Sequence, residues 1–234
     1  MAIPYRDAFR FLADKRDEEL VVTSAGNSSQ MWWDVTRDAD KTFYLDASMS
    51  MSTLFASGVA YGLPQAKVWA FMGDGAFVMN PAMLMVERDL NLSNLVHILV
   101  SNRVYGGTSD LDLPNKPVTD YVAMAKSMGL ERCWNFETLG ALEDGFDAAF
   151  RGNDQGHSFV VLELDQERAD GLIAQYVAGD GAASVEYGSD LMTGLIQAEK
   201  YGALTMLGDV RARGMASELS NAVLRRDVLS PERW

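Results

Sequence analysis

Cysteine and histidine are scarce in this chain of 234 residues, which has one cysteine and two histidines. A single cysteine, Cys133, excludes an intrachain disulfide and a zinc site built from several cysteines. It lies in the short apolar stretch ERCWNF, where we expect a small core residue and not a nucleophile. The histidines, His97 and His157, lack a metal-ligand spacing such as HExxH. Because His97 lies inside the apolar run NLVHILV, we expect it to be structural.

Long apolar runs are also missing, and acidic residues outnumber basic ones. No run approaches the roughly 20 residues that span a bilayer, and the first twenty residues carry charges where a signal peptide needs its apolar stretch. We therefore expect a cytoplasmic protein. The formal net charge of −13 at pH 7 repels polyanions, so we expect neither nucleic acid nor a membrane as partner. A small anion is not excluded, because backbone amides and a metal ion can bind it locally.

Apolar, β-prone runs alternate with helical patterns through the first two thirds of the chain. The strand candidates are residues 20–24, 42–46, 67–72, 94–102, 132–136 and 158–164. The helix candidates are residues 5–15, 28–36, 51–61, 80–91, 119–128 and 138–151. Most strand candidates are apolar throughout, as a sheet covered on both faces requires. The alternation predicts an α/β fold with a doubly wound, mainly parallel sheet and helices on both faces.

The pattern changes after about residue 166, and this change suggests a division of the chain. We expect residues 1–165 to form one α/β domain, with ligands bound at the carboxyl ends of its strands. Residues 166–234 are expected to form a helical C-terminal extension, with helices near 190–202 and 209–226. Such an extension suits an interface element.

The strongest chemical signal is VWAFMGDGAFVMN, in which a Gly-Asp-Gly turn follows an apolar strand and precedes a helix-compatible segment. Gly73 and Gly75 permit close backbone approach, and the free amides of Ala76 and Phe77 at the helix start favour a phosphate oxygen. Asp74 places a carboxylate beside that phosphate, which is how proteins usually hold Mg²⁺. Alone, the tripeptide is weak evidence, because it also occurs in plain turns such as AGDGAA further along the chain.

A second element strengthens this reading. Asn102 lies twenty-eight residues after Asp74, at the end of the apolar strand NLVHILVSN. One strand–helix–strand unit spans about thirty residues, so Asn102 is expected to return to the same edge of the sheet as Asp74. Its amide oxygen is a candidate second metal ligand, and the main-chain carbonyl of Val104 is a candidate third.

The Gly-Asp-Gly turn, a spacer of this length and a strand ending in Asn resemble the motif of thiamine-diphosphate enzymes. NLVHILVSNRVYGGTSDL further resembles the pattern LDN-x-x-Y-x-x-TGG of sulfopyruvate and phosphonopyruvate decarboxylases, and the chain resembles the beta subunit of the two-subunit members. The resemblance covers roughly residues 15–165. It implies thiamine diphosphate and Mg²⁺ as cofactors, a 2-oxo acid as substrate and decarboxylation, a lyase reaction, as the activity.

The resemblance also implies roles for individual residues. Asp74 and Asn102 resemble the side-chain ligands of the metal, and Val104 resembles the carbonyl ligand. The residues that match cofactor-binding positions are Gly26, Asn27, Ser48, Met49, Gly73, Gly75, Ala76, Phe77, Tyr105 and Gly106. Met49, in ASMS, falls where a bulky apolar residue supports the V shape of the cofactor. The alternative is that Met49 is an ordinary core residue in a chain with 13 methionines.

Three departures from the family pattern bear on this interpretation. Ser101 stands where Asn or Asp usually precedes the metal-binding Asn, and Ala47 and Ser50 replace two glycines. Gln30 stands where an arginine often follows the first strand loop. If that arginine binds the acidic tail of phosphonopyruvate or sulfopyruvate, its replacement puts these substrates in doubt. The sequence therefore supports the cofactor more strongly than the substrate.

The chemistry of thiamine diphosphate needs a glutamate beside the pyrimidine ring, and the family takes it from a separate pyrimidine-binding domain. This chain shows no second α/β domain, so we expect no catalytic residue of its own and a partner subunit that supplies the glutamate. The active site would then form at the interface of a heterodimer or heterotetramer.

Other readings stay open on the sequence. The chain suits a carboligase or acyl-transferase subunit as well as a decarboxylase subunit, and a non-catalytic scaffold is a further possibility. Asp110 and Asp112 are expected in a solvated loop. Glu87, Arg88 and Asp89 are expected on an exposed helix face or at a dimer contact.

Overall fold

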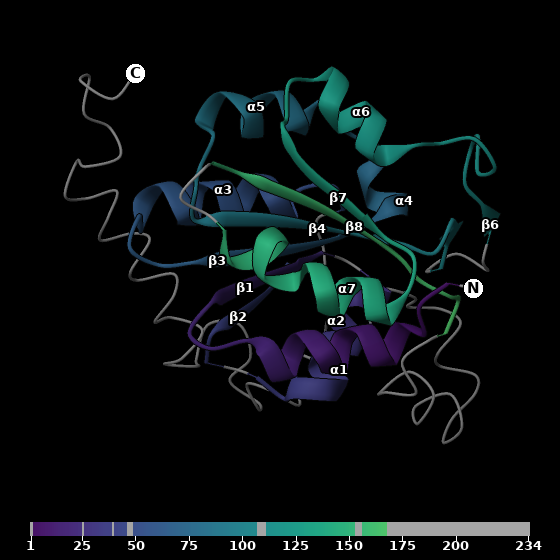
Figure 1. Ribbon diagram of the computed structural model, residues 1–234, viewed down its shortest axis with the longest axis horizontal. Coiled ribbons are helices and arrows are strands. Elements are labelled where there is room, and N and C mark those ends of the chain that lie inside the picture. The colour runs from purple at the N-terminus through teal and green to yellow at the C-terminus, as the bar shows by residue number, and fades with distance from the viewer. Residues whose placement is uncertain are drawn as a thin grey trace, which may run out of the picture.

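Six parallel strands form the central sheet of the computed structural model (Figure 1). The structure describes residues 2–24, 26–38, 40–45, 49–106, 111–152 and 156–167. In chain order the sheet strands are β1 (Leu20–Ser24), β2 (Thr42–Leu45), β3 (Val68–Gly73), β4 (Leu95–Ser101), β7 (Arg132–Phe136) and β8 (Ser158–Glu163). They lie in the order β2-β1-β3-β4-β8-β7. Each predicted strand is confirmed to within one residue at either end.

Helices cover both faces of the sheet, as the apolar strands require (Figure 1). One face carries α1 (Tyr5–Lys15), α2 (Asn27–Thr36), α7 (Leu139–Phe146) and the π-helical segment η1 (Asp147–Arg151). The other carries α3 (Ser52–Gly62), α4 (Asp74–Phe77), α5 (Met83–Leu90) and α6 (Tyr121–Ser127). Successive residues of β3 alternate between the two layers: Trp69 and Phe71 face the first, and Ala70 and Met72 the second. The predicted doubly wound fold is confirmed.

Capping side chains explain where two of the helices begin. The Asp120 carboxylate accepts a hydrogen bond from the Ala123 amide at 2.8 Å at the start of α6, and the Thr138 hydroxyl accepts one from Ala141 at 3.2 Å at the start of α7. The helix expected over 80–91 is shorter than predicted. Its first residues form turns, and α5 runs only from Met83 to Leu90.

The sequence-based placement of Glu87 was wrong. Arg88 and Asp89 are exposed on α5, as expected, but Glu87 is 1% exposed and faces the sheet. The reason is helical geometry, because neighbouring residues of a helix point about 100° apart and three charges in a row cannot share one face.

Cys133 is half-buried against the core, and burial raises the pKa of its thiol to about 11. The thiol is therefore protonated at neutral pH and is a poor nucleophile, as expected.

The segment before α1 joins the end of the sheet. Ile3 forms a parallel bridge with Leu164, and the Tyr5 amide donates to the Asp165 carboxylate at 3.1 Å.

The expected helices near 190–202 and 209–226 lie outside the described residues, so the division after residue 165 stays a prediction. Within the part of the chain that the structure describes, no helix has the length and apolar character needed to cross a membrane.

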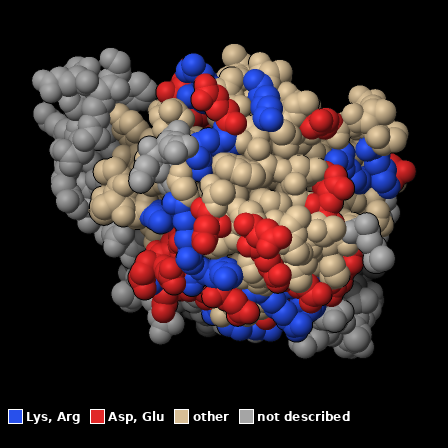
Figure 2. Space-filling model, in the orientation of Figure 1, with Lys and Arg blue, Asp and Glu red and all other residues tan. Residues whose placement is uncertain are grey.

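Surface charge is mixed on the face shown in Figure 2, where acidic and basic side chains are interspersed along its lower half. This pattern differs from the continuous basic surface that nucleic-acid binding requires.

Asp38 stabilises the junction between α2 and β2. Its carboxylate accepts hydrogen bonds from Arg16 Nη1 at 2.8 Å, from the Lys41 amide at 3.1 Å and from the Thr42 hydroxyl. Burial alone would raise the pKa of Asp38, but the bonds from Thr42 and Arg16 outweigh it and hold the pKa at about 2.

We expect Asp38→Asn to lower the free energy of unfolding at pH 7 by about 1–2 kcal/mol, allowing for solvent screening of a partly exposed group. The pKa is depressed in the folded state, so this contribution is present above the unfolded pKa near 4 and is lost as the pH falls towards 2. Urea denaturation at pH 7 and at pH 2.5 measures the difference. Asp17→Asn, at an exposed carboxylate, is the control. A stability difference that stayed constant across this pH range would contradict the assignment.

Candidate functional site

Three loops at the carboxyl edge of the sheet carry most of the residues singled out in the sequence. They follow β1, β3 and β4, and parallel strands bring these ends to one edge. The register of β3 and β4 pairs Gly73 with Val100, so Asp74 and Ser101 leave the sheet side by side. The predicted return of the Asn102 segment to the edge that carries Asp74 is therefore present in the structure.

The Asp74 carboxylate lies against the segment that contains Asn102. It is 1% exposed, and its Oδ2 accepts a hydrogen bond from the Arg103 amide at 2.7 Å and lies 3.2 Å from the Ser101 hydroxyl. Its Oδ1 accepts from the Gly75 amide at 2.9 Å. Since Ser101 and Arg103 flank Asn102, these bonds hold the carboxylate within reach of the Asn102 turn.

Burial raises the pKa of Asp74 to about 6, although the hydrogen bonds from Arg103, Ser101 and Gly75 oppose this shift. The groups that bind the carboxylate are neutral amides and a hydroxyl. The Arg103 guanidinium is directed elsewhere, to Glu163. A buried carboxylate with this environment favours a cation as an additional partner.

Asn102 lies in the turn that leads into a small pair of antiparallel strands, β5 (Val104–Tyr105) and β6 (Leu111–Asp112), which the sequence did not reveal; Val104 is the first residue of β5. The Val104 amide donates a long hydrogen bond of 3.3 Å to Asn102 Oδ1. Arg103 has a φ of 64°, which turns the chain sharply between the two residues. A carbonyl oxygen has two lone pairs, so Asn102 Oδ1 keeps one for a ligand.

The Gly-Asp-Gly turn leads directly into the short helix α4. The first intrahelical bond runs from the Val78 amide to the Asp74 carbonyl at 2.9 Å, so the amides of Ala76 and Phe77 belong to the first turn and lack intrahelical acceptors. A Cβ added at Gly73 would meet no atom within 4 Å, so there is open space in front of the turn. This combination is typical of an anion-binding loop.

The loop after β1 also has open space. Gly26 has a φ of 95°, and a Cβ there would meet no atom within 4 Å. Asn27 is the first residue of α2, and its side-chain amide donates to the Glu167 carbonyl at 2.9 Å. Tyr5 is buried nearby and forms a side-chain hydrogen bond with Asn27, which lowers the pKa of its hydroxyl. Burial and the Asp74 charge outweigh this bond and raise that pKa well above its usual value.

Comparison with known proteins identifies the domain. Residues 24–164 match the family described as thiamine pyrophosphate enzyme, C-terminal TPP binding domain. The chain belongs to this family.

Curated relatives give a more specific comparison. The chain is 31% identical over 156 residues to the sulfopyruvate decarboxylase subunit beta of Methanothermobacter thermautotrophicus, and the match covers 64% of this chain and 83% of that protein. The subunit beta of Methanococcus maripaludis is 26% identical over 131 residues, covering 56% of this chain and 69% of the relative. The sulfopyruvate decarboxylase of Methanosarcina acetivorans is 29% identical over 125 residues, and the match covers 53% of this chain and 32% of that protein.

Solved structures confirm the fold. The benzoylformate decarboxylase of Polynucleobacter necessarius superposes with a TM-score of 0.59 at 21% identity, over 70% of this chain and 33% of that chain. A 4-hydroxybenzoylformate decarboxylase of Rhodococcus jostii superposes with a TM-score of 0.57 at 18% identity, over 69% of this chain and 32% of that chain. The chain thus spans about a third of these longer proteins. The predicted family and its cofactor, thiamine diphosphate, are confirmed, and the expected decarboxylase class agrees with the names of these relatives.

The remaining expected cofactor residues have different environments. Met49 is 43% exposed, so the alternative of an ordinary core residue does not hold, and Ser48 lies outside the described residues. The Phe77 side chain is fully buried among His97, Tyr121 and Phe159. Only the backbone of Phe77 is therefore available to a ligand.

Tyr105 and Gly106 lie at the tip of β5, and both are half-buried. The Tyr105 ring packs on Gly75, where an added Cβ would lie 2.8 Å from Cδ1 of the ring. The β5–β6 pair therefore folds over the Gly-Asp-Gly turn and depends on the absence of a side chain there. Of the two loop acids, Asp112 is exposed and pairs with Lys116, whereas Asp110 lies outside the described residues.

We expect Gly75→Ala to destabilise the domain by about 1–3 kcal/mol, because the new methyl group overlaps the Tyr105 ring. Gly140→Ala is the matched control: its added Cβ meets no atom within 4 Å and lies in helix α7, where alanine is favoured by up to about 1 kcal/mol. Urea denaturation of the two variants measures the contrast. Equal stability of the two variants would show that the Tyr105–Gly75 contact is unimportant.

Sequence reasoning missed a network behind Asp74. The Ser101 hydroxyl lies 3.0 Å from Glu163 Oε2 as well as 3.2 Å from Asp74 Oδ2, and it donates to one carboxylate at a time. Glu163 also forms a two-point ion pair with Arg103, whose guanidinium lies over the Tyr121 ring. Ser101, one of the departures from the family pattern, thus links the Asp74 turn to β8.

Proposed function

We propose that this chain binds Mg²⁺ and the diphosphate of thiamine diphosphate as one subunit of a two-subunit 2-oxo acid decarboxylase that acts on sulfopyruvate. The observation that carries the proposal is the buried Asp74 carboxylate held against the turn of Asn102. The proposal also draws on the beta-subunit names of the relatives.

The residues present fit a divalent ion. Asp74, Asn102 and the carbonyl of Val104 offer hard oxygen donors, and Mg²⁺ prefers such oxygens together with phosphate and water. The space in front of Gly73 and Gly26 leaves room for a diphosphate. When bound, thiamine diphosphate supplies a carbon nucleophile and an electron sink for the loss of CO₂ from a 2-oxo acid.

The chain's own residues would bind and orient the cofactor. The first-turn amides of Ala76 and Phe77 would donate to the diphosphate, with Asn27 and Gly26 on one side and Tyr105 and Gly106 on the other. Met49 would support the V shape of the cofactor, and its polarizable thioether suits such a contact. Ser48, next to Met49, is proposed as a further contact.

A partner subunit would supply the catalytic glutamate. Apolar side chains on and beside α3 and α5 are exposed in this chain: Met51 43%, Met79 59%, Met85 60% and Val86 46%. The two helices pack on each other, and the Thr53 hydroxyl donates to the Met83 sulfur at 2.9 Å. Such exposed apolar side chains are suited to burial by another protein, in a heterodimer or heterotetramer.

The neutral Gln30 bears on the substrate. It is half-buried in α2, where many relatives are expected to have an arginine. Gln30 cannot form an ion pair with the sulfonate of sulfopyruvate, so we assign that role to a cationic group of the partner subunit. The site residues of this chain thus account for the cofactor, and substrate selection is assigned to the interface.

The test uses the chain co-purified with its partner, which we expect to be encoded by a neighbouring reading frame. With Mg²⁺ and thiamine diphosphate, sulfopyruvate should yield equal amounts of CO₂ and sulfoacetaldehyde, faster than pyruvate or phosphonopyruvate. Product analysis with an added aldehyde distinguishes a carboligase, which would form a hydroxyketone in place of the free aldehyde. A complex that binds no cofactor would favour the scaffold reading and overturn the proposal.

A further inference from the structure

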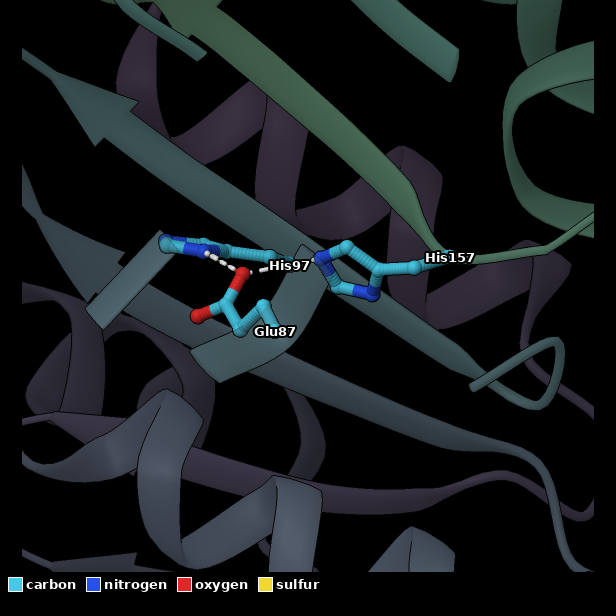
Figure 3. Close-up of side chains that lie close together, drawn as sticks. All are labelled: Glu87, His97 and His157. Carbon is cyan, nitrogen blue, oxygen red and sulfur yellow. Dashed lines mark hydrogen bonds and ion pairs between the residues drawn. The ribbon is translucent and has the colours of Figure 1, made fainter. Parts of the chain in front are cut away.

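Glu87, His97 and His157 form a buried polar cluster away from the cofactor site (Figure 3). Their exposed fractions are 1%, 0% and 3%. Glu87 lies on α5, His97 on β4, and His157 immediately before β8. Because His97 pairs with Phe159 in the parallel register, His157, two residues earlier, points to the same face of the sheet as His97. The fold brings together side chains that are sixty residues apart.

Both imidazole rings point at one carboxylate oxygen, as Figure 3 shows. Glu87 Oε2 lies 3.0 Å from His97 Nδ1 and 2.8 Å from His157 Nε2. One ligand atom from each residue lies within 4.8 Å of the other two. Around a tetrahedral zinc ion with bonds of about 2.0–2.1 Å, ligand atoms are about 3.3 Å apart. Widening the two short contacts by about half an ångström would therefore admit the ion.

Hydrogen bonds alone leave this cluster incomplete. Glu87 Oε1, His97 Nε2 and His157 Nδ1 are buried and have no hydrogen-bond partner within the described structure. Buried polar atoms are normally paired. Of these three, Glu87 Oε1 would gain a partner from an ion bound between His97 Nδ1 and His157 Nε2. A carboxylate that binds a metal with both oxygens would use Glu87 Oε1 together with Oε2. The three residues then offer four donor atoms: these two oxygens, His97 Nδ1 and His157 Nε2.

Access to the cluster comes from one side. His157 lines a cavity of about 350 Å³ that it shares with Asn91, Leu130 and Arg132. The cavity is large enough for several water molecules and so offers an ion a path to the side of the cluster that His157 closes. On the other side, the His97 ring packs against Phe77 and Phe159, which exclude water.

We propose that Glu87, His97 and His157 form a structural zinc site that ties α5 to β4 and β8. Two imidazoles and one carboxylate are a ligand set that suits zinc and not Mg²⁺, which prefers oxygen. The site is structural because His97 precedes Ser101 by four strand residues, or about 13 Å, and so lies far from the edge that carries Asp74. The proposal is independent of the proposed cofactor function.

The first measurement is metal content and thermal stability of the full chain, prepared in metal-free buffer and then titrated with Zn²⁺ alone. We expect one zinc per chain that survives dialysis and a Tm raised by several degrees. Glu87→Gln, which keeps the shape and removes the charge, should lose both effects. Asp89→Asn, an exposed neighbour on the same helix, and Asp74→Asn, in the other site, should keep both.

A wild-type chain that retains no zinc, or a Glu87→Gln variant that retains it, would overturn the proposal. If Glu87→Gln does not fold, the wild-type chain loaded with Co²⁺ decides the question. A visible d–d spectrum of tetrahedral Co²⁺ with nitrogen ligands is expected. The spectrum of octahedral, oxygen-bound Co²⁺ would place the ion elsewhere.

Discussion

Asp74→Asn is expected to lower the affinity of the complex for thiamine diphosphate in the presence of Mg²⁺ by roughly 100-fold or more. The substitution keeps the size of the side chain and its position against the turn of Asn102, but it removes the negative charge that a divalent ion requires. Isothermal titration calorimetry with the cofactor, at fixed Mg²⁺, measures the change.

Asp112→Asn is the matched control for this substitution. Asp112 is an exposed carboxylate in the neighbouring strand β6, and its removal should leave the affinity within a factor of two or three, as for surface charges generally. Asn102→Ala should weaken binding by a smaller factor than Asp74→Asn, because it removes a neutral ligand. An Asp74→Asn complex with wild-type affinity would remove Asp74 from the metal site.

The isolated chain is expected to be inactive, with a decarboxylation rate roughly 10²–10⁴-fold below that of the complex. The reason is that the described residues at the cofactor edge include no glutamate placed as a catalytic acid. Glu163 is engaged with Arg103 and Ser101, and the Glu167 carboxylate pairs with Arg6.

Titration of the purified partner into a fixed amount of this chain tests the expectation. Activity should rise from the background and saturate at a fixed ratio of the two subunits, and each subunit alone, at the same concentration, is the control. A rate proportional to the amount of this chain without partner would contradict the two-subunit account.

The strands and the metal-site candidates could be predicted from the sequence because their signals are local. Each strand is a short apolar run, and Asp74 and Asn102 directly follow two such runs at the spacing of one strand–helix–strand unit. Strands that follow each other through a crossover helix are commonly neighbours, so the convergence of these two residues needed no knowledge of the whole sheet.

The contacts that the sequence did not reveal depend on the order of strands. β8 lies between β4 and β7, so the last strand of the sheet in sequence is inserted next to β4. Nothing local in the sequence indicates this insertion, and it places Glu163 beside Ser101 and His157 beside His97. The helical phase of α5 was likewise missed, because a run of Glu87, Arg88 and Asp89 was treated as one exposed surface.

The most direct measurement is a crystal structure of the complex with Mg²⁺ and thiamine diphosphate. The account predicts one ion within about 2.0–2.3 Å of a carboxylate oxygen of Asp74 and of the amide oxygen of Asn102, with diphosphate oxygens completing its coordination. A diphosphate bound without an ion between these two side chains, or an ion held by other residues, would contradict it.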